Sequence, residues 1–119
     1  MQAVTKYTTV EECVKRMEEG FWRKYNANPD LREKLAGKTR VIQLALTDGH
    51  GTWFHIVDGK LAEVQHGVHP SPDALVTTSK HDLLSVFNGE LKIMQAYLTG
   101  RVRVKASLGD ILFAKSLFG

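Results

Sequence analysis

The sequence predicts an α+β fold in which helices are layered on a five-stranded, mostly antiparallel sheet. Two observations support this class. Apolar residues recur with a helical period near both ends of the chain and with a period of two in the middle, where turn-forming residues separate the strand-like segments. The predicted order is one helix, four strands, two helices, one strand and one helix.

Length and composition indicate one folded domain over residues 1–119. Compact domains most often contain about 100 to 150 residues. Hydrophobic residues make up 43% and charged residues 24% of the chain, which is ordinary for a protein that buries its own core. We therefore expect no second folded unit.

Charge, cysteine content and hydrophobic segments indicate which partners and which cellular compartment to expect. The net charge is +3, but the 16 Lys and Arg residues alternate with 13 Asp and Glu residues, which argues against a dedicated nucleic-acid surface. Cys13 has no partner for an internal disulfide, and the stretch MQAVTKYTTVEEC lacks the apolar run of a secretory signal. No segment approaches the roughly 20 apolar residues of a membrane span. We expect a soluble, cytoplasmic protein that could still touch membranes.

Residues 9–26 show the pattern of an amphipathic helix. Thr8 and Thr9 stand three residues before Glu11 and Glu12, which is the spacing of a capping box. An Asn-Pro pair ends this helix and begins a connection. The apolar face of the helix consists of residues at helical spacing: Val10, Cys13, Val14, Met17 and Phe21.

Strands follow in the middle of the chain. From Thr39 the period changes to two, TDGHG turns the chain, and TWFHIV runs back antiparallel. Asp58 and Gly59 can both adopt the positive φ that a two-residue hairpin turn requires, so a third antiparallel strand is expected at about 61–66. After a loop with two prolines, ALVTT is short and β-branched enough for a fourth strand.

The C-terminal part predicts three helices and a fifth strand. Ser79 caps a helix that Asn88 and Gly89 stop, and a second helix covers 91–98. The stretch RVRVKA alternates cleanly and predicts a strand with one wet, basic face. The closing helix, capped by Ser107, is apolar around nearly its whole circumference. We therefore expect both of its sides to be buried.

The sequence contains no convincing catalytic or metal-binding motif. His66 and His69 form the closest histidine pair, but they lack an acidic or cysteine partner at ligand spacing. His55 lies within a strand and Cys13 on an apolar helix face, where structural roles are expected. GHGTWF lacks the third glycine of a dinucleotide fingerprint. We expect no catalytic residue, metal, cofactor or nucleic-acid partner.

An apolar surplus remains in residues 88–118. The last elements add large apolar side chains to a domain that already has a helix and a hairpin core. These side chains either close that core, which periodicity alone favours, or surround a cavity for an apolar ligand. The residue pattern leaves both alternatives open.

Three stretches share order and spacing with a known family: GTWFHIVDGKLAEVQHG, PDALVTTSKHDLLSVFNGEL and QAYLTGRVRVKASLGDILFAKSL. Together they resemble the sterol carrier protein 2 family, the sterol-binding or nonspecific lipid-transfer domain. The resemblance runs roughly from Val10 to the C-terminus. Its marks are Trp53, Asp58-Gly59-Lys60, Pro72-Asp73-Ala74, Gly89, and Ala96 with Gly100.

The resemblance implies a sheet and helices that enclose a hydrophobic tunnel for a fatty acid, acyl-CoA, phospholipid, sterol or isoprenoid. The implied function is binding, sequestration or transfer of this lipid ligand without catalysis, with room for transient membrane contact and for a homodimer. Family ligands lie between the sheet and the later helices. This location carries over, element by element, to twelve ligand-binding positions: Phe54, Ile56, Phe87, Ile93, Met94, Tyr97, Leu98, Val102, Val104, Ile111, Leu112 and Phe118.

The chain departs from the family pattern in two places. Family members often carry a glycine where this chain has Ala106, and peroxisomal members end in Ser-Lys-Leu, whereas this terminus reads SLFG. The principal alternative is a non-catalytic accessory or dimerisation module that uses the same fold with a filled core. An enzyme with His55 or His66 as a base ranks behind both.

Overall fold

The computed structural model describes residues 6–118, and the side chains as far as residue 117. The α+β class and the five strands are confirmed. The predicted Asn-Pro break separates the first two helices, and the second of these replaces the expected irregular connection. Within the described residues the elements are α1 (Val10–Ala27), α2 (Pro29–Leu35), β1 (Arg40–Leu46), β2 (Gly51–Val57), β3 (Lys60–His66), β4 (Ala74–Thr78), α3 (Lys80–Phe87), α4 (Ile93–Leu98), β5 (Val102–Lys105) and α5 (Leu108–Phe118).

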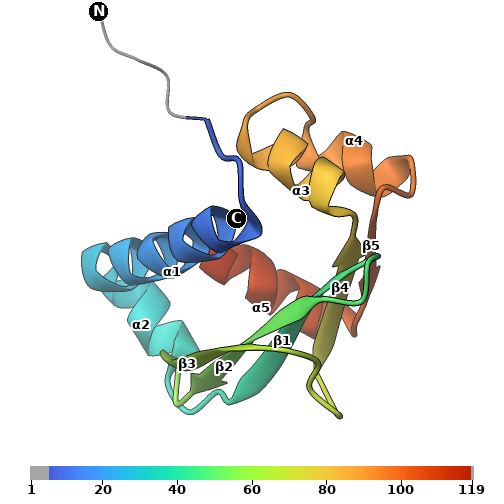
Figure 1. Ribbon diagram of the computed structural model, residues 1–119. Coiled ribbons are helices and arrows are strands. Elements are labelled where there is room, and N and C mark those ends of the chain that lie inside the picture. The colour runs from blue at the N-terminus through green and yellow to red at the C-terminus, as the bar shows by residue number, and fades with distance from the viewer. Residues whose placement is uncertain (1–5, 119) are drawn as a thin grey trace, which may run out of the picture.

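The five strands form one mixed sheet in the order β3-β2-β1-β4-β5 (Figure 1). The predicted meander of β1, β2 and β3 is antiparallel, and β4 pairs antiparallel with β5. The exception is the pair of β1 and β4, which is parallel and places Ile42 opposite Ala74. A parallel pair needs a crossover between its strands, and β2, β3 and the residues after them provide it.

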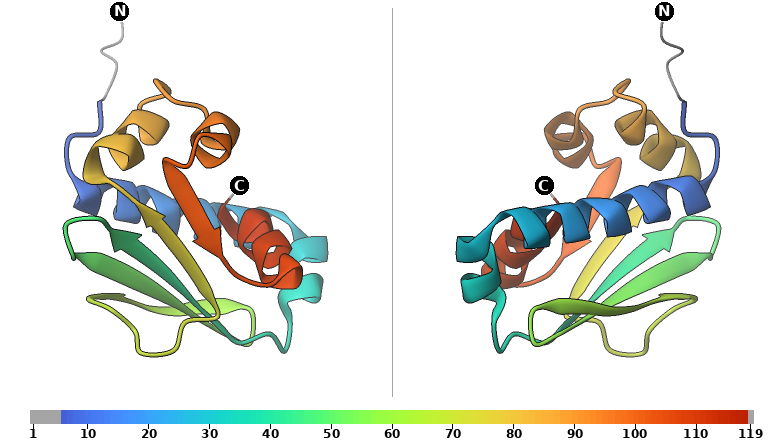
Figure 2. Two further views of the ribbon diagram at one scale, coloured as in Figure 1. Left: turned by 90° about the vertical axis from the view of Figure 1, so that its right-hand side faces the viewer. Right: turned by 90° about the vertical axis from the view of Figure 1, so that its left-hand side faces the viewer.

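Helices cover one face of the sheet. Figure 2 shows α1 and α5 side by side over this face, with α3 and α4 near the end of β4 and the start of β5. Because side chains alternate along a strand, every second residue of β1 and β2 points toward the helices. The resulting core contains Cys13, Val14, Phe21, Ile42, Leu44, Leu46, Phe54, Ile56 and Leu117.

The connection between β3 and β4 lies against the opposite face of the sheet. Gln43 of β1 is fully buried there and donates from Nε2 to the carbonyl oxygen of Gly67 at 2.9 Å. The backbone N–H of His69 donates to Oε1 of Gln43 at 2.6 Å, and the His69 ring packs edge-on against Trp53 with 5.0 Å between centroids. Gln43 therefore anchors this connection to the central strand.

Local signals in the sequence set the ends of several elements. The predicted capping box at Thr9 and Glu12 begins α1, and Ser79 and Ser107 accept backbone hydrogen bonds at the starts of α3 and α5. Asp58 and Gly59 adopt φ values of 51° and 76° in the turn between β2 and β3. These predictions are confirmed, and the local chemistry of caps and turns explains why they succeed.

The expectation that the closing helix is buried on both sides is wrong. Leu117 of α5 is 1% exposed, and Phe113 and Ala114 pack against the core, whereas Leu108 is 72% and Leu112 55% exposed. The helix contacts α1 and the core along one side, and no other described element covers the side with Leu108 and Leu112. An apolar circumference shows that burial of both sides would be favourable, but it does not supply a second partner.

Candidate functional site

The short helix α4 exposes apolar side chains around most of its circumference. Ala96 is fully buried and packs with Leu91 and Val102 against the end of the sheet. Large apolar residues fill most of the remaining circumference, and contiguous exposed apolar surface of this kind commonly marks an interaction site. The exposed residues are Ile93 (55%), Met94 (64%), Tyr97 (49%) and Leu98 (76%).

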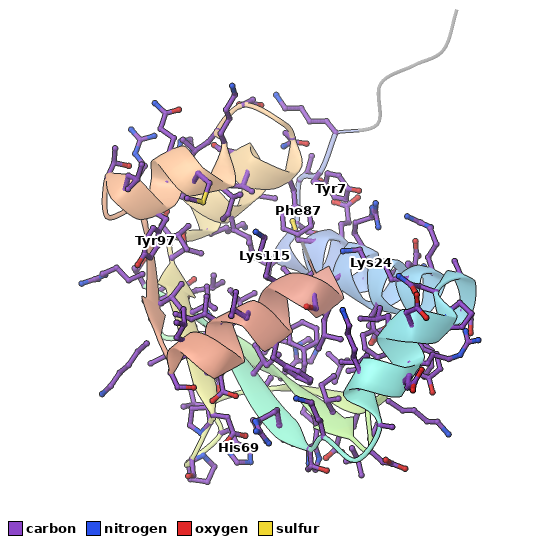
Figure 3. The ribbon with its side chains drawn as sticks, turned by 180° about the vertical axis from the view of Figure 1, so that it is seen from behind. Tyr7, Lys24, His69, Phe87, Tyr97 and Lys115 are labelled. Atoms are coloured by element: carbon purple, nitrogen blue, oxygen red, sulfur yellow. The ribbon has the colours of Figure 1, made fainter. Side chains whose placement is uncertain are left out.

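The exposed side of α5 lies across from α4. Leu108, Leu112 and Lys115 stand at intervals of four and three residues and therefore share one side of the helix. In Figure 3, Lys115 leaves α5 on the side of α3 and α4, and Tyr97 leaves α4 on the side of α5. Among the described residues Lys115 has no ion-pair partner. The two helices thus direct apolar side chains and one cation toward the region between them.

An open pocket of about 360 Å³ lies where α1 passes the C-terminal ends of α3 and α5. Its apolar lining residues are Tyr7, Met17, Phe87 and Leu117. The rings of Tyr7 and Phe87, both labelled in Figure 3, meet edge-on with 5.6 Å between centroids. Asn88 holds Tyr7 in place, since its amide exchanges two hydrogen bonds with the Tyr7 backbone at 2.7 and 2.9 Å.

The charged lining of this pocket has one sign. Arg16, Arg23 and Lys24 of α1 line it, and no carboxylate belongs to its described lining. Gly20 lies between these cations on the same side of α1 and leaves the wall without a side chain. An apolar floor with a cationic wall suits an amphiphile that has an anionic headgroup.

The structure divides the twelve predicted ligand-binding positions into three groups. Phe54, Ile56 and Val102 are buried in the cores, at 2%, 0% and 6% exposed. Phe87, Val104 and Ile111 are half-buried. Ligand contact by any of these positions stays a prediction. The exposed group is Ile93, Met94, Tyr97, Leu98 and Leu112, and the Phe118 side chain lies outside the described residues.

Part of this site comes from the N-terminal segment and α1, which the sequence pattern did not indicate as ligand-binding elements. Met17 was assigned to a core face, and Tyr7 had no assignment. Tyr7 reaches the site through Asn88, which lies 81 positions away in the chain, so no local pattern could reveal it. The recurrence of Arg16, Gly20 and Arg23 on one side of the helix was the available signal.

A second open pocket of about 510 Å³ lies at the other end of α1, beside the β1–β2 turn. It combines the apolar residues Val10 and Leu46 with Asp48, His50 and His66. Within the described residues, no group of three His, Cys, Asp or Glu side chains could hold a metal ion.

The Cys13 thiol is not an activated nucleophile. Burial, with a smaller effect from the charge of Glu12, raises the pKa of the Cys13 thiol to about 11. A thiol with this pKa remains protonated near neutral pH and is a poor nucleophile. His55 Nδ1 lies 3.4 Å from Glu63 Oε1 on the face of the sheet that carries Trp53, away from both apolar helix faces.

The comparison with protein families decides the assignment. The model of the SCP-2 sterol transfer family matches residues 15–118. This chain belongs to the SCP-2 sterol transfer family. The resemblance that the sequence stretches predicted is therefore confirmed. In the described part of this SCP-2 chain, no helix is both long enough and apolar enough to cross a membrane.

The SCP-2 chain aligns with relatives of similar length and with short parts of longer proteins. It is 32% identical to the rat (Rattus norvegicus) hydroxysteroid dehydrogenase-like protein 2 over 83 residues, which is 66% of this chain and 16% of that protein. The palmitated SCP2L2 of Aedes aegypti aligns with a TM-score of 0.62 and 22% identity over 92% of both chains. The inverting sec-alkylsulfatase of Pseudomonas sp. aligns with a TM-score of 0.56 and 18% identity over 73% of this chain and 14% of the enzyme.

Proposed function

We propose that this chain, as one domain, binds and sequesters or transfers a lipid with an acyl or isoprenoid tail, and that it catalyses no reaction. The observation that carries the proposal is that exposed apolar side chains of both helices, Tyr97 of α4 and Leu108 and Leu112 of α5, lie on the sides that face the region between the helices. Family membership and the palmitated mosquito relative support it. The raised pKa of Cys13 supports the non-catalytic part of the proposal.

The energetics suit an apolar ligand. Burial of each methylene contributes about 0.8 kcal/mol, so a tail of about sixteen carbons gains on the order of 10 kcal/mol before ordering costs. The exposed side chains of Leu112 and Tyr97 can contribute to this burial without displacing the core residues Phe54 and Ile56. Broad tail selectivity follows, because apolar contact has little directional preference.

The pocket beside α1 suits the headgroup. Three cations of α1 line it beside Phe87 and Leu117: Arg16, Arg23 and Lys24. A fourth cation, Lys115, projects from the side of α5 that faces α3. Guanidinium groups can bind a carboxylate or phosphate through paired hydrogen bonds. We therefore assign the anionic end of the lipid to this pocket and the tail to the region between α4 and α5.

The substitution Leu112→Arg tests the tail site. Leu112 is 55% exposed, so an arginine there can reach water, and we expect the free energy of unfolding to change by no more than about 0.5 kcal/mol. Uptake of a fluorescent fatty acid by the delipidated protein should be lost. Val68→Arg is the matched control, because Val68 is 68% exposed on the β3–β4 connection, and it should retain uptake.

Two results would contradict the proposal. One is unchanged uptake by Leu112→Arg, and the other is a wild-type protein that neither takes up the probe nor releases lipid on organic extraction and mass spectrometry. The alternative accessory or dimerisation module draws on the same exposed faces of α4 and α5. Sedimentation equilibrium distinguishes it, since that module would form a dimer which Leu112→Arg dissociates.

A further inference from the structure

We propose that Asn88 is a modification site, at which deamidation of the side chain releases the N-terminal segment, residues 6–9, from the pocket beside α1. The sequence contains three Asn residues, and Asn88 is the one that precedes a glycine. Glycine has no side chain to shield its backbone nitrogen, so Asn-Gly is the pair most prone to this reaction. The chemistry requires no lipid and is therefore independent of the ligand assignment.

The end of α3 explains why the two residues are adjacent. Asn88 follows the last residue of this helix, and Gly89 adopts a φ of 75° after it. A left-handed residue at the end of a helix is usually glycine, because other residues are strained there. Asn88 has a separate role, since its amide binds the backbone of Tyr7. The helix end and the attachment of the N-terminal segment thus together place a reactive pair at this position.

Deamidation consumes one water molecule and releases one ammonia. The backbone nitrogen of Gly89 loses its proton and bonds to Cγ of Asn88, the Cγ–Nδ2 bond breaks, and Nδ2 leaves with a proton as ammonia. Water then adds to one of the two carbonyl carbons of the cyclic imide and breaks the bond of that carbon to the Gly89 nitrogen. Attack at Cγ gives aspartate, and attack at the backbone carbon gives isoaspartate. No group is oxidised or reduced.

The docked N-terminal segment holds Asn88 in an unreactive geometry. The backbone N–H of Tyr7 donates to Asn88 Oδ1 at 2.7 Å, and Nδ2 donates to the Tyr7 carbonyl oxygen at 2.9 Å. The N–H of Gly89 donates to the carbonyl oxygen of Val86 at 3.1 Å. Ring closure requires the Gly89 nitrogen to eclipse Cβ of Asn88, which the ψ of 1° at Asn88 does not allow. The reaction therefore requires Tyr7 to undock and the end of α3 to rotate.

Local undocking of the segment is sufficient for this rotation. The Tyr7 ring packs edge-on against Phe87 with 5.6 Å between centroids. The ion pair of Lys6 with Glu90 measures 3.2 Å, but its side chains are 67% and 53% exposed, and exposed pairs contribute little. Segments near a chain end open more readily than core elements. Asn88 can thus react in a protein that remains otherwise folded.

The product no longer holds the segment. In aspartate, a carboxylate oxygen replaces the Nδ2 donor and faces the carbonyl oxygen of Tyr7, so two acceptors meet where a hydrogen bond was. In isoaspartate, the backbone at the end of α3 is longer by one atom. Tyr7 lines the pocket together with Arg16 and Arg23, so its release opens the wall of the pocket beside these cations.

Mass spectrometry of the full chain, incubated in mildly alkaline buffer and then digested, tests the reaction. We expect the peptide with Asn88 to gain the mass difference between an amide and an acid, and the peptide with Asn26 to keep its mass. Tyr7→Ala should react at least about tenfold faster, because loss of a packed ring weakens docking. Tyr25→Ala is the matched control, since it removes another half-buried ring, packed on Phe21, and should react as the wild type does.

Hydrogen exchange at the backbone N–H of Tyr7 tests the release. Asn88→Asp reproduces one product, and we expect the Tyr7 amide to exchange at least about tenfold faster than in the wild type. Asn26→Asp makes the same chemical change at an exposed position of α1 and should leave this exchange rate unchanged.

Three results would overturn the site. Equal reaction rates in Tyr7→Ala and the wild type, including no reaction in either, would show that docking does not control Asn88. Equal acceleration by Tyr25→Ala would assign the reaction to a general loss of stability. Unchanged exchange in Asn88→Asp would show that the modified residue still holds the segment. None of these measurements involves a lipid, so their failure leaves the proposed lipid binding standing.

Discussion

Gln43 is a polar residue that is fully buried in the described structure, so its stability contribution depends on its hydrogen bonds. Its side chain is fully buried, and its amide joins the central strand to the β3–β4 connection through Gly67 and His69. Such a group stabilises the fold only while its partners are paired, because a buried polar group without a partner loses its hydration without compensation. Gln43 therefore helps to hold the middle of this connection on the sheet, while backbone hydrogen bonds of Gly67 and Asp73 hold its two ends.

The substitution Gln43→Leu measures this dependence. Leucine has a similar size but leaves the N–H of His69 without its acceptor, so we expect the free energy of unfolding to fall by about 1–3 kcal/mol. Urea denaturation provides the measurement. Gln65→Leu on the exposed strand β3 is the control and should change the value by less than about 0.5 kcal/mol. Equal effects of both changes would show that the Gln43 network contributes nothing specific.

The buried Cys13 thiol should make the free energy of unfolding fall at alkaline pH. Burial raises the pKa of its thiol from 9.0 to about 11, so between these values the unfolded chain has lost a proton that the folded protein keeps. The contribution is fully present below pH 9.0 and is lost as the pH rises toward 11, at about 1.4 kcal/mol per pH unit. Denaturation of wild type and Cys13→Ala across this range should show a steeper decline for the wild type. Parallel declines would contradict the prediction.

At the scale of elements, α5 is held along one side only. Leu117 is 1% exposed within the core, whereas Leu112 is 55% exposed on the same helix. We expect Leu117→Ala to lower the free energy of unfolding by about 2–5 kcal/mol and Leu112→Ala to change it by less than about 0.5 kcal/mol. Denaturant unfolding of the two variants makes the comparison, and similar losses would show that both sides of α5 are packed.

Elements were predictable from the sequence where their signals are local. The caps at Thr9, Ser79 and Ser107 and the turn at Asp58 depend on neighbouring residues, and all of them are confirmed. The parallel pairing of β1 with β4 was not specified, because alternation along a strand does not reveal which strand lies beside it. The exposed side of α5 was mispredicted for the same reason, because apolar residues on a helix do not reveal which element, if any, packs against them.

The candidate site was predictable only in part. The sequence pointed to α4 and α5 as the apolar elements, and both expose apolar faces. The pocket beside α1 depends on Tyr7 and Asn88, which meet from distant parts of the chain. The sequence pattern also does not tell how deeply an apolar strand residue is buried. Phe54 and Ile56 were predicted to contact a ligand, and both are buried in the core.

For the whole molecule, ligand binding and stability should be linked. A ligand that binds only the folded protein stabilises it by about 2.7 kcal/mol at a concentration one hundred times its dissociation constant. We expect palmitate to raise the melting temperature of the delipidated wild type and of Val68→Arg, but not that of Leu112→Arg. A similar rise in Leu112→Arg would place the tail outside the region between α4 and α5.

The parallel pair at the centre of the sheet has a consequence for how the chain folds. Ile42 pairs with Ala74, 32 positions later, whereas the hairpins of β1, β2 and β3 join near neighbours. Local hairpins close faster than distant pairs, so the meander should assemble before β4 arrives. Until then one edge of β1 has unpaired backbone groups, and such an edge can pair with another chain. The slowest pairing in the molecule therefore also sets the period in which the nascent chain is open to aggregation.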